Sequence, residues 1–141
     1  MKYSALIFNK IDTNLFVEDM DCLQIVMCCD QEDILEFSMH PIPKTMVVKK
    51  SKALYIALLN GLKAISQENV FVINESVSKE EIETLKKELS AYPAIYLNEN
   101  VQAFDTRLVM FCLQFAIESN LAIDSYAKAV ELLADTPLKY L

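Results

Sequence analysis

The stretch that decides the fold is a strand followed by a helix, and residues 69–89 read NVFVINESVSKEEIETLKKEL. Residues 69–73 form a continuous apolar run, which is typical of a strand buried in a parallel sheet. Ser78 and Glu81 have the spacing of a capping box, in which each side chain accepts a hydrogen bond from the other residue's backbone N–H. We therefore expect a strand over 69–73 and a helix that ends near Leu89, with its apolar side chains on one face.

The same alternation of strands and helices runs through the whole chain. We expect strands over 3–8, 23–29, 45–48, 69–73, 94–97 and, briefly, 138–141, and helices over 30–37, 51–65, 78–89, 106–119 and 125–133. The polar segment between the first two strands has no clear helical periodicity. Strands that alternate with helices predict a mostly parallel sheet with helices on both faces. The sequence thus predicts one doubly wound, Rossmann-like α/β domain over residues 1–141, with about five to six strands.

Composition and charge exclude two classes of ligand site. The chain has 13 lysines and arginines against 20 aspartates and glutamates, which gives a net charge of −7. A chain without a basic face cannot neutralise a nucleic-acid backbone, so we expect no nucleic-acid partner. The single glycine, Gly61, also excludes a glycine-rich phosphate loop, because such a loop needs several positions where the backbone approaches the ligand closely.

The cysteines and the apolar runs indicate a cytosolic protein without a membrane partner. No apolar run approaches the roughly 18 residues of a membrane-spanning helix, and the first ten residues are charged too early for a signal peptide. The four cysteines form no C-x-x-C pair, and we interpret them as reduced core thiols. A metal site is not expected, because the one histidine, His40, has no partner motif and is placed in a loop. A Cys28–His40 or Cys112–His40 dyad stays open, although burial is the simpler interpretation.

Two polar motifs have a chemical and a structural interpretation. The tetrapeptide Asn9-Lys10-Ile11-Asp12 resembles a guanine-reading motif, but that motif needs a phosphate loop to hold the triphosphate, so we interpret it as a turn. Asp19 and Asp21 lie just before a strand, where they would line either a cation site or a solvated loop. The solvated loop is favoured because charged residues are usually exposed.

The helix predicted over 106–119 is apolar on nearly all sides. Such a helix is either buried on both sides or lies in an interface between subunits. Phe111 and Phe115 are the candidate interface residues, and the partner is either a second copy of the chain or another protein.

The order of these segments resembles the methylerythritol-phosphate cytidylyltransferases and their ribitol-phosphate relatives. The segments that carry the resemblance are 51–65, 70–73, 78–89, 101–108, 123–125 and 129–131. The first contains an "N-G-L" like that of the family, and 101–108 is similar to the family's "T-P-Q-A-F-x-x-x-L" motif. The resemblance runs in order over 45–141, and more weakly over the first two strands. It implies a nucleotide-diphospho-sugar-transferase-like fold.

The departures from this family fall on the residues that its chemistry needs. The family's glycine-rich loop carries Arg and Lys and wraps the triphosphate, whereas residues 8–12 contain no glycine. An Arg precedes the family's "N-G-L" helix, but here only Lys52 is near that position. Asn74 stands where the family has a metal-holding Asp, and an amide has no charge to hold Mg²⁺, although Glu75 lies next to it. Residues 90–100 are too few for the projecting arm with which the family dimerises.

The leading hypothesis is a cytidylyltransferase-like domain without catalytic activity, which acts by self-association or by binding a protein and needs no cofactor. The alternative is a minimal cytidylyltransferase that transfers CMP from CTP to a sugar or polyol phosphate, with Mg²⁺, using Lys10, Lys52 and Glu75. A third possibility is a small-molecule site where the strands end, because open α/β sheets bind ligands at the carboxyl ends of their strands. Asn9, Asn74 and Asn98, together with Asp30 and Lys49, would then converge on one rim.

Overall fold

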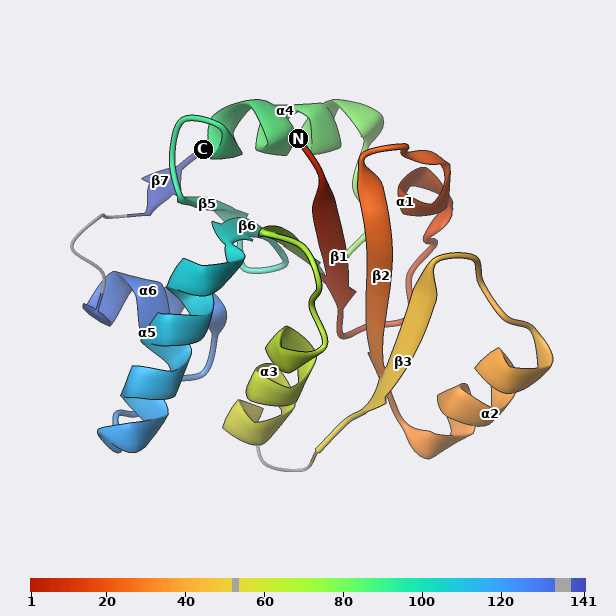
Figure 1. Ribbon diagram of the computed structural model, residues 1–141, viewed down its shortest axis with the longest axis horizontal. Helices are drawn as coiled ribbons and strands as arrows, with labels where there is room; N and C mark the ends of the chain where they lie inside the picture. The colour runs from red at the N-terminus through yellow and green to blue at the C-terminus, as the bar shows by residue number, and fades with distance from the viewer. Residues whose placement is uncertain (52–53, 134–137) are drawn as a thin grey trace.

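The computed structural model describes residues 1–51, 54–133 and 138–141 (Figure 1). Its strands are β1 (Tyr3–Ile7), β2 (Cys22–Cys29), β3 (Thr45–Lys49), β4 (Asn69–Ile73), β5 (Ala94–Asn98), β6 (Val101–Asp105) and β7 (Lys139–Tyr140). Its helices are α1 (Asn14–Glu18), α2 (Gln31–Met39), α3 (Leu54–Lys63), α4 (Lys79–Leu89), α5 (Thr106–Glu118) and α6 (Tyr126–Leu133). No helix in these ranges is long and apolar enough to cross a lipid bilayer.

The strands form one sheet in the order β3-β2-β1-β4-β6-β5-β7. The first four strands pair in parallel, and β6 lies antiparallel between β4 and β5. Strand β7 pairs in parallel with β5. The sheet is therefore mostly parallel, as the sequence predicts, but its described part has seven strands rather than five to six.

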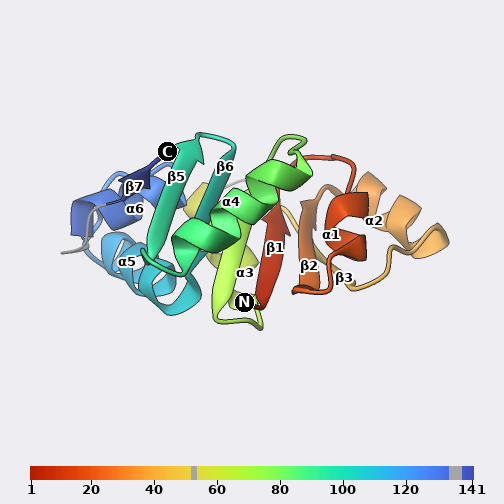
Figure 2. The same ribbon diagram turned by 90° about the horizontal axis from the view of Figure 1, so that it is seen from above.

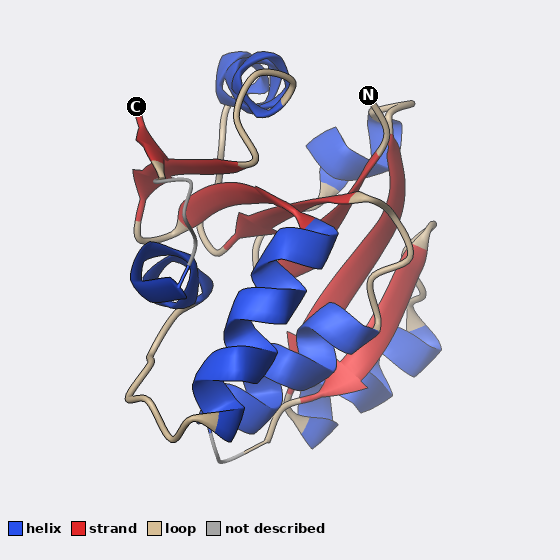
Figure 3. Cartoon of the chain, turned by 60° about the vertical axis from the view of Figure 1, so that its left-hand side comes forward, coloured by secondary structure: helices blue, strands red, loops and turns tan. Residues whose placement is uncertain are grey.

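Helices cover both faces of the sheet. The side chain of Leu6 in β1 joins a core with α3, α5 and α6, while Ala5 and Ile7 join a second core with α1 and α4. This alternation follows from the two-residue period of a strand. Figure 2 shows α4 crossing one face, and Figure 3 shows α3 and α5 on the other. The expected doubly wound α/β architecture is confirmed.

Two elements are absent from the sequence prediction. Helix α1 occupies the segment 9–21, but it has five residues and no side-chain cap, so no periodicity marks it; Phe16, 1% exposed, holds it against the sheet. Strand β6 contains Gln102, which interrupts its apolar pattern, and its pairing with β4 and β5 fixes it as a strand.

The predicted helix starts differ in their capping. Ser78 and Glu81 form the expected capping box at the start of α4. Asp105 accepts a hydrogen bond from the N–H of Leu108 and caps α5. Asp30 occupies the N-cap position of α2, but its side chain makes no capping hydrogen bond.

A cluster of ion pairs lies at the amino ends of the parallel strands, where it joins α4 to the loop before β2. Lys86 Nζ of α4 lies 2.8 Å from Asp19 Oδ2 and 3.1 Å from Asp21 Oδ2. The hydroxyl of Tyr3 donates to Asp19 at 2.7 Å. Asp19 and Lys86 are only 15% and 13% exposed. The expectation of a solvated loop is therefore wrong for Asp19, because α4 brings Lys86 to it from 67 residues along the chain.

Candidate functional site

The candidate site lies at the opposite edge, where the parallel strands end. Because β1 and β4 run side by side in the same direction, Asn9 and Asn74, which follow them, lie at one rim. Strand β5 runs antiparallel to β6 and therefore in the direction of β4, so Asn98 at its end reaches the same rim. Open α/β sheets bind ligands at this edge.

Hydrogen bonds join the loops after β1 and β4. The side-chain oxygen of Asn74 accepts from the backbone N–H of Phe8 at 2.9 Å, and Asn9 Nδ2 donates to the backbone carbonyl of Asn74 at 2.9 Å. The N–H of Asn74 donates to the carbonyl of Asn100 at 2.7 Å. The rim loop after β1 is thus fastened by amide groups of the protein itself.

Glu75 belongs to the same group of contacts. Its carboxylate oxygens accept from Asn98 Nδ2 at 3.2 Å and from Asn100 Nδ2 at 3.4 Å. The structure therefore brings Asn9, Asn74 and Asn98 to one group of contacts, through the Asn74 backbone, Asn100 and Glu75.

The other residues of the hypotheses do not join this group. Lys10 Nζ pairs with Glu36 Oε2 of α2 at 2.9 Å, and this hydrogen bond raises the pKa of the lysine. Lys52 lies outside the described residues. Asp30 and Lys49, although at the same edge, make no hydrogen bond to the asparagines in the described chain. Helix α2 thus supplies Lys10 with a partner other than Glu75.

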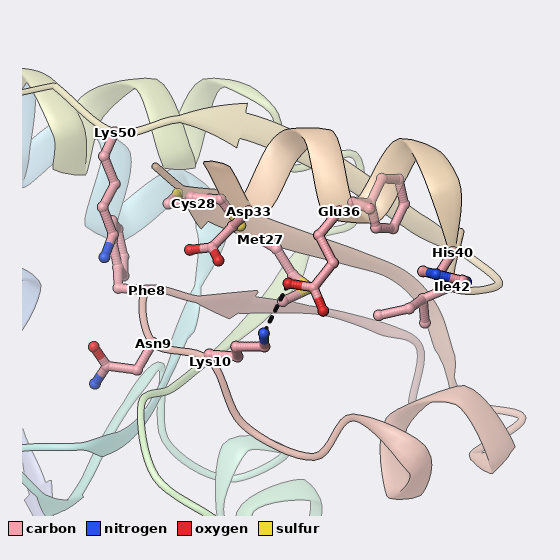
Figure 4. A pocket seen from close by; sticks show the side chains of 12 residues that line it. Phe8, Asn9, Lys10, Met27, Cys28, Asp33, Glu36, His40, Ile42 and Lys50 are labelled. Carbon is pink, nitrogen blue, oxygen red and sulfur yellow. Dashed lines mark hydrogen bonds and ion pairs between the residues drawn. The ribbon is translucent and has the colours of Figure 1, made fainter. Parts of the chain in front are cut away.

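A small hollow beside the rim, the α2 hollow, lies between β1, β2 and α2 (Figure 4). It measures about 110 Å³, and Cys28, Cys29 and His40 are among its lining residues. Burial raises the pKa of Cys28 to about 12 and also raises that of Cys29, so both stay thiols at neutral pH. Figure 4 shows His40 next to Ile42 at the far end of the hollow from Cys28. A Cys28–His40 dyad is therefore not formed.

The other dyad is not formed either. Cys112 is 1% exposed in the core between the sheet and α5, whereas His40 is exposed at the end of α2. All four cysteines are buried and free, which confirms the interpretation as core thiols.

A larger hollow, the central hollow, follows the rim between β1, β4 and the start of α6. It measures about 390 Å³ and is lined by Phe8, Asn74, Gln102, Asp124 and Tyr126, among others. Tyr126 donates from its hydroxyl to the carbonyl of Leu58 at 2.5 Å. Among the described residues that line the central hollow, Lys50 is the one lysine.

The single glycine serves packing and lies away from the rim loops. Gly61 is in α3, where an added Cβ would lie 3.2 Å from Leu6 Cδ1 and 3.3 Å from both Phe8 and the Tyr126 hydroxyl. Its place explains the close approach of α3 to the sheet and to α6. The loop after β1 contains no glycine. None of its described residues has a positive φ.

These residues fit a nucleoside triphosphate poorly. A triphosphate needs backbone N–H groups and cations at the rim. The N–H of Phe8 is occupied by Asn74, Lys10 is paired with Glu36, and Asp124 adds negative charge to the central hollow. Among the described residues, no group of three His, Cys, Asp or Glu side chains is arranged to hold a metal ion.

Comparison with known proteins identifies the class of fold. No protein-family model and no curated protein sequence matches the chain. Among solved structures, it is similar to the mannosyltransferase PcManGT from Pyrobaculum calidifontis in complex with GDP-Man and Mn²⁺, with a TM-score of 0.65 and 11% identity over 99% of this chain and 54% of that one. The domain therefore has the fold of nucleotide-diphospho-sugar transferases.

Within this class, the chain has the fold of the methylerythritol-phosphate cytidylyltransferases. The 4-diphosphocytidyl-2C-methyl-D-erythritol synthase from Anaerococcus prevotii superposes with a TM-score of 0.75, at 16% identity over 99% of this chain and 86% of that one. The corresponding cytidylyltransferase from Francisella tularensis also reaches 0.75, at 12% identity over 99% and 90%. At these identities the likeness shows the fold, and at that level the resemblance found in the sequence is confirmed.

Three residues of the site were not named as site residues in the sequence analysis. Lys50 and Asn100 line a hollow or fasten the rim but lie in no quoted motif, and Gln102 lies in the family-like segment 101–108, which gave it no role in a site. Lys50 follows β3 directly, so the rule that loops after parallel strands meet at one edge would have found it. Asn100 and Gln102 reach the rim because β6 is antiparallel, and the sequence gives no sign of that direction.

Proposed function

We propose that this chain is a cytidylyltransferase-fold domain that binds other molecules but does not transfer a cytidylyl group. The observation that carries the proposal is the hydrogen bond from the Phe8 N–H to Asn74, which closes the rim loop where a triphosphate would need free donors. Transfer of this kind depends on positioned donors and charge neutralisation, and the loss of one such donor typically costs about 100-fold or more in rate. Several are missing here, so no useful transfer remains.

We further propose that the binding surface is α5 and that the partner is a second copy of the chain. The helix buries Cys112 and Leu113 but leaves Phe111 and Phe115 at 63% and 47% exposure, with ring centroids 6.2 Å apart. Two adjacent exposed phenylalanines favour association, because their burial removes apolar surface from water. Free cysteines suit the reducing cytosol as the place of action.

Sedimentation equilibrium at micromolar concentration tests the self-association. The wild-type chain is expected to be a dimer, and the Phe111→Ser and Phe115→Ser double variant a monomer with the same fold. A matched control, Leu35→Ser on the exposed side of α2, should leave the dimer intact. A monomeric wild-type chain at these concentrations would contradict a homodimer.

The fold itself favours the second candidate, a minimal cytidylyltransferase. In that case, Glu75 would hold Mg²⁺ with CTP, and Lys10 would have to leave Glu36. An assay of pyrophosphate release from CTP, with methylerythritol phosphate or ribitol phosphate as acceptor, separates the two candidates. We expect no release above the rate without protein, and release that Glu75→Gln abolishes would establish the enzyme.

A further inference from the structure

A second large hollow, the α6 hollow, lies beyond the central hollow and has a different character. It measures about 540 Å³ and lies between the sheet, α6 and β7. The two hollows share Glu99, Gln102, Asp124 and Ser125, so they adjoin. The strand register explains this arrangement, since Val72, Gln102 and Tyr96 are aligned on neighbouring strands and present one face of the sheet to the two hollows.

Gln102 provides an unpartnered acceptor in this space. The residue is only 3% exposed, and its Nε2 donates to the backbone carbonyls of Glu99 at 3.1 Å and Asn98 at 3.4 Å. Because carbonyl oxygens can only accept, these bonds fix the orientation of the amide. Its oxygen then has no hydrogen-bond partner in the described chain, which contains no side-chain polar atom that is both fully buried and unpartnered. The oxygen therefore reaches the accessible space of the hollows.

The charged groups around Gln102 are mostly carboxylates. Glu99, Asp124 and Glu131 line the α6 hollow, with Lys128 as the one cation among its described lining residues. Across the described chain, no ion pair joins these carboxylates to a cation. Such a site repels phosphates, and in this respect it is opposite in character to a CTP site.

Aromatic rings complete the lining at the β7 end. Tyr96 and Tyr140 lie with ring centroids 5.3 Å apart, and both line the α6 hollow. The faces of such rings attract cations, while their apolar parts suit a short methylene chain.

We propose that the α6 hollow binds a small organic ammonium ion, with a short aliphatic diamine as the fitting class of ligand. An ammonium group offers three donors and no acceptor, which matches the amide oxygen of Gln102 and the carboxylates of Asp124 and Glu99. Glu131 lines the α6 hollow but not the central hollow, and it offers a partner for the second ammonium group. The net charge of −7 adds a general attraction for cations. This inference goes beyond the proposed function and does not depend on it.

Isothermal titration calorimetry of the full chain at low ionic strength tests the proposal with two isosteric probes. The diamine 1,4-diaminobutane should give saturable heat at millimolar concentration, whereas 1,4-butanediol, which has hydroxyls in place of the ammonium groups, should give none. Added salt should weaken the diamine binding, because it screens exposed charges. Absence of heat with the diamine, or equal binding of the diol, would overturn the proposal.

Surface variants locate the site without disturbing the core. Asp124→Asn combined with Glu131→Gln should weaken the diamine binding by about tenfold or more, since charge-assisted hydrogen bonds are lost. Glu80→Gln on α4, on the other face of the sheet, is the matched control and should bind as the wild type does. Equal weakening by both changes would contradict the assignment, because it would indicate non-specific attraction by net charge.

A third variant tests the amide oxygen itself. Gln102→Met keeps the length of the side chain but removes the acceptor, and it should weaken the diamine binding if circular dichroism shows the native fold. In the wild type, the side-chain NH₂ resonances of Gln102 should shift on titration, and this readout holds even if the variant does not fold. Unshifted Gln102 resonances at saturation would overturn the site. A chain that binds neither diamine nor CTP would refute this inference and leave the proposed function intact.

Discussion

The two edges of the sheet use polar residues in opposite ways. At the amino edge, Lys86 lies between Asp19 and Asp21, and Lys44 Nζ donates to the backbone carbonyls of Asp19 and Cys22 at 2.9 and 3.0 Å. At the carboxyl edge, the oxygen of Gln102 and the carboxylates of Glu99, Asp124 and Glu131 have no partner in the described chain and line the hollows. The polar groups of the first edge hold the fold together. At the second edge, Asn74 and Glu75 fasten the rim in the same way, but the Gln102 oxygen and the three carboxylates stay available to a ligand.

The largest expected effect comes from removing the central cation of the amino edge. Lys86→Met leaves two partly buried carboxylates without a counter-ion, which should lower the free energy of unfolding by about 3 kcal/mol, at the lower end of the range for broken buried pairs. Urea denaturation at pH 7 measures this change. Lys10→Met, which breaks the exposed pair with Glu36 near the other edge, should leave the stability nearly unchanged. If Lys86→Met and Lys10→Met lowered the free energy of unfolding equally, the two edges would not differ in how much their ion pairs stabilise the fold.

Acid should weaken the amino edge by a smaller amount. Burial by itself would raise the pKa of Asp19, but hydrogen bonds from Lys86, the Asp21 N–H and the Tyr3 hydroxyl outweigh it and lower the pKa. A pKa that is lower in the folded chain than in the unfolded chain stabilises the fold above the unfolded value of about 3.9, and this stability is lost as the pH falls through the folded value.

Urea denaturation between pH 6 and about pH 3 should therefore show falling stability, most steeply below about pH 4. The slope should be shallower in Asp19→Asn, which has no carboxyl group at that position to protonate. The same slope in this variant and in the wild type would show that other carboxylates account for the acid sensitivity.

The smallest expected effect concerns the rim loop. Asn74→Ala removes the acceptor of the Phe8 N–H, and the loss of this hydrogen bond should lower the free energy of unfolding by about 1 kcal/mol. Asn60→Ala, an exposed change on α3, is the control and should not destabilise the chain. Because the hydrogen bond protects the Phe8 amide, its hydrogen exchange should also be faster in Asn74→Ala. Unchanged exchange would show that the rim loop is held by other contacts.

Much of the architecture is encoded in local pattern. The apolar run of β4 and the capping box of Ser78 define a strand and a helix without reference to the rest of the chain. Helix α1 and strand β6 are different, because Phe16 and Gln102 acquire their roles only through contacts with distant strands. Local periodicity cannot report such contacts.

The site was predictable only in part for the same reason. The rule that loops after parallel strands meet at one edge places Asn9 and Asn74 correctly. It does not show that Asn74 closes the loop after β1 or that Lys10 turns to Glu36, since these pairings depend on side-chain geometry. The hollows around Gln102 depend on the antiparallel direction of β6 and on the packing of α6, which no local pattern carries.

We propose above that the rim does not hold a nucleoside triphosphate. A calorimetric titration of the chain with CTP and Mg²⁺, carried to millimolar CTP, tests it most directly. No saturable heat is expected, in the wild type and in Glu75→Gln alike. Saturable heat in the wild type that Glu75→Gln weakens would contradict it.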